Sequence, residues 1–424
     1  MTEKIAKPQL RFAGFDDTWE QRKAVDIADY SKGNGYSKSD LTENGTPIIL
    51  YGRLYTKYQF AIDEVDTFAT PKDGSIYSQG KEVIIPASGE TAEDIARASA
   101  VEKSGILLGG DLNILRPFNF INPLFLALTI SNGEPQKELA KKAQGKSVVH
   151  IHNSDIQEVT VSFPTRAEQD RIVAVFRSLD NLITLHQRKY DKLTNVKKSM
   201  LEKMFPKNGS NVPEIRFKGF SDTWEQRKFD EVFDCTIPNN TLSRAELNYE
   251  SGSVRNIHYG DILIKYGSVV DVQNDEIPFA TGKSSDDFKG ALLQDGDIII
   301  ADTAEDETTG KACEIGNSQG LDVVSGLHTM VCRPRNKMAL GYLGYYLNSD
   351  AYHHQLLPLM QGIKVLSLSR TNVQKTMVCY PKSKAEQQLI ADCFRNLDNL
   401  ITLHQRELEK LKNLKKACLE KMFV

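Results

Sequence analysis

The ten-residue run LDNLITLHQR stands at residues 179–188 and returns unchanged at residues 397–406. It lies inside a longer repeat, AEQDRIVAVFRSLDNLITLHQRKYDKLTNVKKSMLEKMF (167–205) and AEQQLIADCFRNLDNLITLHQRELEKLKNLKKACLEKMF (385–423), whose copies agree at 26 of 39 positions. A repeat of this length indicates that the chain consists of two copies of one structural unit.

The long repeat predicts two long helices. Neither copy contains Gly or Pro, and both are rich in Leu, Lys, Glu, Gln and Arg, which favour helix. Apolar positions recur at spacings of four and three residues, as in a coiled-coil seam, so we expect the two helices to pack antiparallel. The predicted seam consists of Phe176, Leu179, Ile183, His186, Tyr190, Leu193, Phe394, Leu397, Ile401, His404, Leu408 and Leu411.

A second repeat opens each half of the chain. PQLRFAGFDDTWEQRK (8–23) matches PEIRFKGFSDTWEQRK (213–228) at 12 of 16 positions, and the two copies hold both tryptophans. We expect Trp19 and Trp224 to pack against the helices rather than to stack on bases. Residues 24–142 and 229–359 show little identity, so a duplicated frame carries two different inserts.

The inserts read as mixed α/β. Strands are predicted in 82–87, 156–163, 297–301 and 375–380, two strands around Gly267 in 260–272, and helices in 122–130 and 340–350. The predicted fold class is therefore α+β, with two tandem mixed domains joined by two long helices in a pseudo-two-fold arrangement. The predicted boundaries are 1–165 and 207–382 for the domains, and 166–206 and 383–424 for the helical segments.

Composition is that of an ordinary globular protein, with 40 % apolar and 26 % charged residues. No apolar run is long enough to span a membrane and no secretory signal is evident, so we expect a cytoplasmic location. The six cysteines form no C-x-x-C pair, which disfavours a zinc ribbon or disulfide framework. A net charge of −3 argues against a protein that coats nucleic acid without specificity.

No motif predicts catalysis. The two GKS triplets, at 145–147 and 282–284, lack the upstream glycine of a phosphate-binding loop. NPLF (122–125) lacks the second proline of the adenine-holding motif of methyltransferases, and ADTAEDETTG (301–310) lacks the ligand spacing of a calcium loop. The acidic segment is expected to be a solvated loop, with a nucleic-acid contact as the alternative.

The whole chain resembles the specificity subunit of type I restriction–modification systems. The two opening motifs, the two long helices and GDIIIADTAEDETTGKACEIG (296–316) carry the resemblance. It implies two target-recognition domains that read an asymmetric, bipartite site in double-stranded DNA. It also implies docking of two modification subunits and of restriction subunits through the helices. S-adenosylmethionine would belong to the modification subunit, and ATP and Mg to the restriction subunit; this chain would be non-catalytic and bind no cofactor or metal.

Side chains expected to contact DNA lie in polar and aromatic stretches of both inserts. In the first insert they are Lys32, Tyr36, Lys38, Arg53, Tyr55, Lys57, Ser88, Glu90, Thr91, Gln144, Lys146 and Ser147. In the second they are Arg255, Asn256, His258, Tyr259, Lys265, Tyr266, Thr303, Glu305, Asp306, Thr308, Thr309, Lys311, Gln361, Lys364, Ser369 and Arg370. Two other readings are a scaffold displaying two binding domains that do not bind DNA, and a stand-alone methyltransferase, which the missing cofactor loop disfavours.

Overall fold

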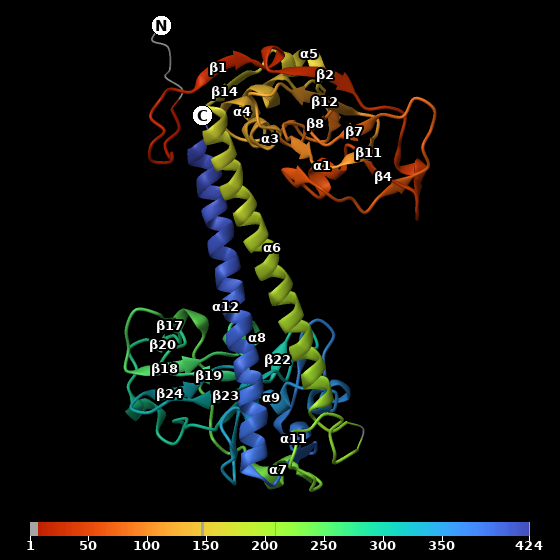
Figure 1. Ribbon diagram of the computed structural model, residues 1–424. Helices are drawn as coiled ribbons and strands as arrows, with labels where there is room; N and C mark the ends of the chain where they lie inside the picture. The colour runs from red at the N-terminus through yellow and green to blue at the C-terminus, as the bar shows by residue number, and fades with distance from the viewer. Residues whose placement is uncertain (1–6, 146–147, 208, 424) are drawn as a thin grey trace. The chain divides into compact units, whose positions relative to one another are not determined.

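A computed structural model describes residues 7–145, 148–207 and 209–423. The chain forms two compact units (Figure 1). Unit 1 is Met1–His186 with Arg406–Val424, and unit 2 is Gln187–Gln405. The long helices α6 (Arg166–Lys203) and α12 (Lys384–Met422) each contribute one end to each unit, so each unit contains one mixed domain and two packed helix ends.

Unit 1 is built around two five-stranded sheets. The first has the order β2 (Ala28–Lys32), β12 (Leu112–Pro117), β8 (Glu82–Pro86), β10 (Ser99–Val101) and β5 (Ala61–Ile62). The second has the order β3 (Leu41–Thr42), β6 (Phe68–Ala69), β4 (Thr46–Ile49), β11 (Ser104–Leu108) and β7 (Tyr77–Gln79). Two strand pairs complete it, β1 (Glu20–Lys23) with β14 (Thr160–Phe163) and β9 (Ser88–Gly89) with β13 (Val149–His150). Its shorter helices are α1 (Arg53–Thr56), α2 (Ala92–Ile95), α3 (Pro123–Ile130), α4 (Gly133–Lys142) and α5 (Asn153–Gln157).

Unit 2 repeats this strand order, except that its second sheet has four strands in place of five. One sheet has the order β16 (Phe233–Asp234), β25 (Thr329–Pro334), β21 (Ile298–Ala301), β23 (Ala312–Gly316) and β19 (Val269–Asp271). The other has the order β17 (Leu247–Asn248), β20 (Phe279–Ala280), β18 (Val254–Ile257) and β24 (Asp322–Ser325). The pairs are β15 (Glu225–Lys228) with β27 (Met377–Tyr380) and β22 (Thr303–Ala304) with β26 (Leu366–Ser367). Its helices are α7 (Phe229–Val232), α8 (Tyr259–Ile264), α9 (Tyr342–Leu347), α10 (Asp350–His353) and α11 (Arg370–Val373).

The two inserts therefore share one topology although their sequences have diverged. The central strands β8 and β21 are buried along their whole length, which explains their nearly continuous apolar sequences EVIIP and IIIA. A buried acid precedes the apolar residues of each, and an arginine of the neighbouring strand pairs with it. Glu82 lies 3.6 Å from Arg116, and Asp297 lies 2.6 Å from Arg333. The two inserts therefore share this burial pattern and this ion pair, although few of their residues are identical.

The helix ends pack antiparallel within each unit, and the same contacts recur. In unit 1 the ring centroids of Phe176 and Phe423 are 5.8 Å apart, and Lys415 Nζ lies 2.5 Å from Asp180. In unit 2 the rings of Phe394 and Phe205 stack at 5.8 Å, and Lys197 Nζ lies 2.5 Å from Asp398. The predicted α+β class, with tandem mixed domains and closely packed long helices, is confirmed.

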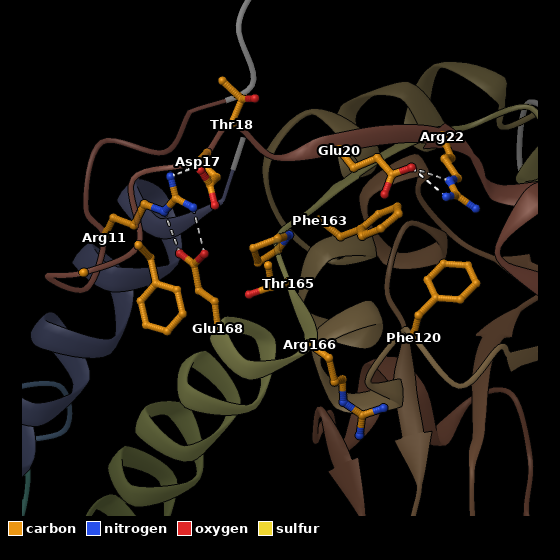
Figure 2. Close-up of a pocket in the computed structure, with 13 residues that line it drawn as sticks. Arg11, Asp17, Thr18, Glu20, Arg22, Phe120, Phe163, Thr165, Arg166 and Glu168 are labelled. Atoms are coloured by element: carbon orange, nitrogen blue, oxygen red, sulfur yellow. Dashed lines mark hydrogen bonds and ion pairs between the residues drawn. The ribbon is translucent and has the colours of Figure 1, made fainter.

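A buried ion pair joins each opening motif to the first turn of a long helix. Figure 2 shows the guanidinium of Arg11 facing Glu168 of α6, with N–O distances of 2.7 and 2.8 Å. Arg216 makes the same two bonds to Glu386 of α12, at 2.6 and 2.9 Å. A bidentate pair of this kind fixes orientation as well as distance. The pair borders a cavity of about 400 Å³ that Arg22, Phe120 and Phe163 also line (Figure 2).

Both tryptophans lie in the cores, as expected. Trp19 packs edge-on against Phe125 with centroids 5.7 Å apart, and Trp224 packs edge-on against Phe205 at 6.3 Å. The indole Nε1 of Trp224 donates to Glu386 at 3.3 Å, whereas Nε1 of Trp19 is buried without a hydrogen-bond partner among the described residues. Both tryptophans are thus part of the hydrophobic cores, and neither is exposed for stacking on bases.

Along the long helices, all predicted seam residues are buried or half-buried. Phe176, Leu179, Phe394 and Leu408 are buried, and the remaining eight predicted positions are intermediate. Other apolar residues of the identical run face solvent instead: Leu182, Leu185, Leu400 and Leu403 are 42, 46, 44 and 53 % exposed. Each long helix therefore carries exposed leucines near its middle in addition to its packed face.

Some local predictions were wrong. Residues 260–272 were expected to form two strands, but the first part belongs to α8 and only Val269–Asp271 is a strand. His258 caps this helix by accepting from the Gly260 N–H at 3.2 Å, and Asp261 and Ile262 are its buried residues. The strand expected over 156–163 begins only at Thr160, after helix α5. The helices expected in 122–130 and 340–350 are present as α3 and α9.

Candidate nucleic-acid interface

A shared segment follows β4 and β18 at the same position in the two units. YGRLYTKY (51–58) and YGDILIKY (259–266) agree at four of eight positions and form the short helices α1 and α8. The lysine near the end of each segment is exposed and lies beside an acid. Lys57 Nζ lies 2.5 Å from Asp66, and Lys265 Nζ lies 2.7 Å from Glu276. A short helix with a lysine–acid pair beside it is therefore present in both units.

A hairpin follows the same plan in both units. The backbone groups of Gln144 and His150 exchange bonds of 3.1 and 2.8 Å, and those of Gln361 and Ser367 exchange bonds of 3.0 and 2.8 Å. Gly145 and Gly362, with φ of +135° and +128°, start these turns, and a Cβ there would lie 1.9 Å from a backbone oxygen. We call residues 144–145 with 148–150, and residues 361–367, the QG hairpins.

The QG hairpins lie beside the loops that follow the central strands. Strand β13 of the first pairs with β9, and β26 of the second pairs with β22. In unit 2 the hairpin projects apolar side chains into solvent, since Ile363 is fully exposed and Val365 is 51 % exposed. An exposed apolar tip at an otherwise polar surface can contact thymine methyl groups.

In unit 1 a cavity of about 1070 Å³ collects many of the predicted contact residues. Its lining combines the aromatic rings of Tyr51 and Tyr55, whose centroids are 6.2 Å apart, with Lys38, Lys57 and Glu90. Burial raises the pKa of Tyr55, and the nearby Tyr51 and Glu90 act in the same direction, so the phenol remains a hydrogen-bond donor. The cavity thus offers stacking surfaces, cations and hydrogen-bonding groups together.

The corresponding surface of unit 2 surrounds Tyr259. Its ring centroid lies 4.6 Å from that of His258 and 5.2 Å from that of His328. Burial lowers the pKa of His258, which favours the neutral ring that accepts the Gly260 N–H. Lys311 closes the acidic loop by donating to the carbonyl oxygens of Leu263 and Tyr266 at 2.9 and 3.1 Å. The loop and α8 therefore form one connected surface.

The structure places some predicted contact residues in the interior. The buried side chains are Tyr36, Ser88, Asn256, His258, Tyr266 and Thr309. Tyr36 lies 2.5 Å from Ser75 Oγ, and the Asn256 amide donates to Asn240 at 3.1 Å. Ser88 Oγ lies 3.0 Å from His150 Nδ1, which fixes the start of the loop against the QG hairpin. Except for Tyr36, which also lines the cavity of unit 1, these side chains lie beneath the surface and support it.

Three predicted cations are held by internal partners. Arg53 retains 10 % exposure and donates to Asp66 at 2.7 Å and to Gln59 at 3.0 Å. Hydrogen bonds from Lys57 and Arg53 lower the pKa of Asp66 to about 2. Arg255 donates to the Val272 carbonyl and lies over the Phe279 ring at 5.7 Å. Lys311 is the third, and its pKa is lowered by burial.

The other predicted residues of the described chain reach the surface. Those that are exposed are Lys32, Lys38, Lys57, Glu90, Thr91, Gln144, Lys265, Glu305, Asp306, Thr308, Gln361, Lys364 and Ser369. Tyr55, Tyr259, Thr303 and Arg370 are half-buried. Lys146 and Ser147 lie outside the described residues. No group of His, Cys, Asp and Glu suited to a metal occurs in the described ranges, and no helix there is long and apolar enough to cross a membrane.

The correspondence between the two surfaces was missed in the sequence. Its signal was the pattern YG followed by KY at 51–58 and 259–266, which recurs at nearly the spacing of the longer repeats. Only the structure shows that each unit contains the same three segments. They are the segment with this pattern, the loop after the central strand and the QG hairpin.

The fold is that of a duplicated protein, with two related domains that carry different side chains. A sequence model of the type I restriction modification DNA specificity domain matches residues 16–195 and again residues 221–413. The chain belongs to this family, and it carries two tandem copies of the family's domain. DNA recognition is therefore the role of the two domains.

Relatives and solved structures agree with this assignment. The type I restriction enzyme MjaVIII specificity subunit of Methanocaldococcus jannaschii is 22 % identical over 324 residues, covering 74 % of this chain and 72 % of that protein. The fold is similar to that of a type I restriction–modification S subunit from M. genitalium, with a TM-score of 0.56, 15 % identity and coverage of 98 % and 99 %. It is also similar to a chain from a study of type I restriction–modification complex assembly and conformational transition, with a TM-score of 0.50, 14 % identity and coverage of 96 % and 98 %.

Proposed function

We propose that this chain reads an asymmetric, bipartite site in double-stranded DNA, with one half-site for each unit. The observation that carries the proposal is a common backbone with different side chains at corresponding positions. Tyr55 of α1 corresponds to Leu263 of α8, and the exposed Thr56 corresponds to Ile264, which is 88 % exposed. Because bases are read by side chains, two such surfaces recognise different sequences.

The exposed leucines of the helices support docking of two modification subunits and of restriction subunits. Leu182 and Leu185 in unit 1, and Leu400 and Leu403 in unit 2, come from identical sequence and are all more than 40 % exposed. Pairs of leucines three residues apart lie on one helix face, where they can pack against a partner helix. Their retention in both copies favours one docking site in each unit.

The chain itself would be non-catalytic and would hold no cofactor. S-adenosylmethionine would be bound by the modification subunit, and ATP and Mg by the restriction subunit, as the family resemblance implies. Several charged groups of the described surface support this division, because they are already paired within the chain. Lys57 with Asp66, Lys265 with Glu276 and Arg244 with Asp261 are examples. A protein that binds cellular DNA would be located in the cytoplasm, as expected from the sequence.

The test is a methylation map. The chain and a modification subunit from the same host are expressed in cells without adenine methylation, and N6-methyladenine is located across the genome. We expect one asymmetric motif made of two short half-sites around a fixed gap, and no methylation when either chain is omitted. A symmetric motif, or methylation that does not depend on this chain, would contradict the proposal.

A further inference from the structure

The corresponding turns between β11 and β12, and between β24 and β25, hold non-glycine residues in left-handed backbone conformation. Among the described residues, only Asp111, Asn317 and His328 combine a side chain with positive φ, at 57°, 56° and 53°. Asp111 is the residue before β12, and His328 is the residue before β25, so these two occupy the same position of the shared fold. Glycine adopts this conformation without strain, and other residues do so at an energetic cost.

The backbone at this position has the same structural task in both units. The Asp111 carbonyl accepts from the Ala87 N–H at 2.7 Å, and the His328 carbonyl accepts from the Asp302 N–H at 3.1 Å. These bonds attach the turn to the loop that follows the central strand. Glycine would perform this task equally well, so the turn itself does not explain the side chains.

Both side chains are exposed at the surfaces described above. Asp111 lines the cavity of unit 1 together with Tyr51 and Glu90, and none of the described residues donates a hydrogen bond to its carboxylate. The His328 ring lies edge-on to Tyr259 at 5.2 Å, and its Nδ1 lies 3.6 Å from Asp302. Asn317 differs, because its amide donates to Asp271 at 2.9 Å and so serves the fold.

We propose that Asp111 and His328 are corresponding base-reading residues, one for each half-site; this rests on the proposed function. A carboxylate only accepts hydrogen bonds, so Asp111 selects a base with an exocyclic amino group in the major groove, cytosine or adenine. An imidazole N–H donates, so His328 selects a base with an acceptor on its major-groove edge, such as guanine through N7 or O6, and rejects cytosine, which offers only a donor there. The strained conformation is retained because it aims a functional group from a fixed point of the sheet.

The test uses the complex with the modification subunit and a library of DNA sites that carry every single-base change. Asp111→Gly should lose discrimination, by roughly ten- to hundredfold, at one base pair of one half-site. His328→Gly should do the same in the other half-site. Both variants should keep or raise the melting temperature, because glycine relieves the positive φ. Asp111→Asn, which also tolerates this conformation, should shift the preferred base, since an amide both donates and accepts.

Asn317→Gly is the matched control. It changes the third left-handed residue, and we expect it to alter stability and to leave every base preference as in the wild type. If the wild-type complex has no bipartite site, the proposed function fails. If the wild type has one and Asp111→Gly and His328→Gly keep full discrimination, or weaken all sequences equally, the base-reading role alone is overturned.

Discussion

Removal of Glu386 should destabilise its unit more than removal of Glu168, although the two residues correspond. Each carboxylate binds a largely buried arginine, Arg11 with 10 % and Arg216 with 13 % of the side chain exposed. Loss of one partner of a buried pair costs about 3–5 kcal/mol, and the residual exposure favours the lower end, about 3 kcal/mol. Glu386 also accepts from Trp224 Nε1, so Glu386→Ala leaves a second buried donor without a partner, at about 1–2 kcal/mol more.

Hydrogen exchange of the full chain measures this difference, because it reports the opening free energy of each unit separately. We expect Glu168→Ala to lower that of unit 1 by about 3 kcal/mol and Glu386→Ala to lower that of unit 2 by about 4–5 kcal/mol. In a Trp224→Phe background the excess should disappear, because the indole donor is gone. Equal losses in the wild-type background would refute the role assigned to the indole bond. Losses below about 1 kcal/mol in both units would show that the pairs behave like surface ion pairs.

Three further predictions concern pH, docking and the QG hairpin. Burial raises the pKa of Glu314 to about 7 from 4.5, so its protonated form contributes stability that is complete below about pH 4.5 and is lost as pH rises through about 7. Glu314→Gln should therefore be more stable than the wild type by about 3 kcal/mol at pH 8 and similar at pH 4, as measured by urea unfolding. Leu185→Glu combined with Leu403→Glu should abolish co-purification of the modification subunit, whereas Thr184→Glu, one residue away, should not; retention by the double variant would exclude this helix face. Gly362→Ala should weaken DNA binding by the complex about tenfold, because a Cβ there would lie 1.9 Å from the Val365 oxygen and distort the hairpin; unchanged affinity would remove the hairpin from the interface.

The frame of the molecule could be predicted from sequence because its signals are local or repeated. Two helices without Gly or Pro and with a continuous apolar seam have few alternatives, and they are present over Arg166–Lys203 and Lys384–Met422. The interior position of Trp19 followed from its place in the shared motif. The common topology of the inserts could not be predicted in this way. This topology depends on which positions are buried and on ion pairs such as Glu82 with Arg116. An alignment of the two inserts by identical residues shows neither the buried positions nor the ion pairs.

The candidate interface was predicted at the level of segments and less well at the level of side chains. Polar and aromatic composition marked the stretches that contain Tyr36 and Arg53 as surface, but it could not reveal that Tyr36 bonds to Ser75 or that Arg53 is held by Asp66. Both are long-range contacts made by residue types that are equally common at binding surfaces. Asp111 and His328 were missed because a left-handed conformation leaves no mark in composition.

One pair of backbone bonds has a consequence for the order of the chain. In unit 2, the Ile215 N–H donates to the Lys203 carbonyl at 3.0 Å. The linker of the chain joins these two residues directly. In unit 1, Leu10 N–H donates to the Lys421 carbonyl at 2.9 Å, and the same junction is made with no connecting peptide. The two units thus contain equivalent backbone junctions, one at the chain termini and one at the linker between the repeats. A circular permutant, joined between residues 423 and 7 by a short linker and opened between 206 and 213, keeps every packed element and exchanges only which recognition domain is synthesised first.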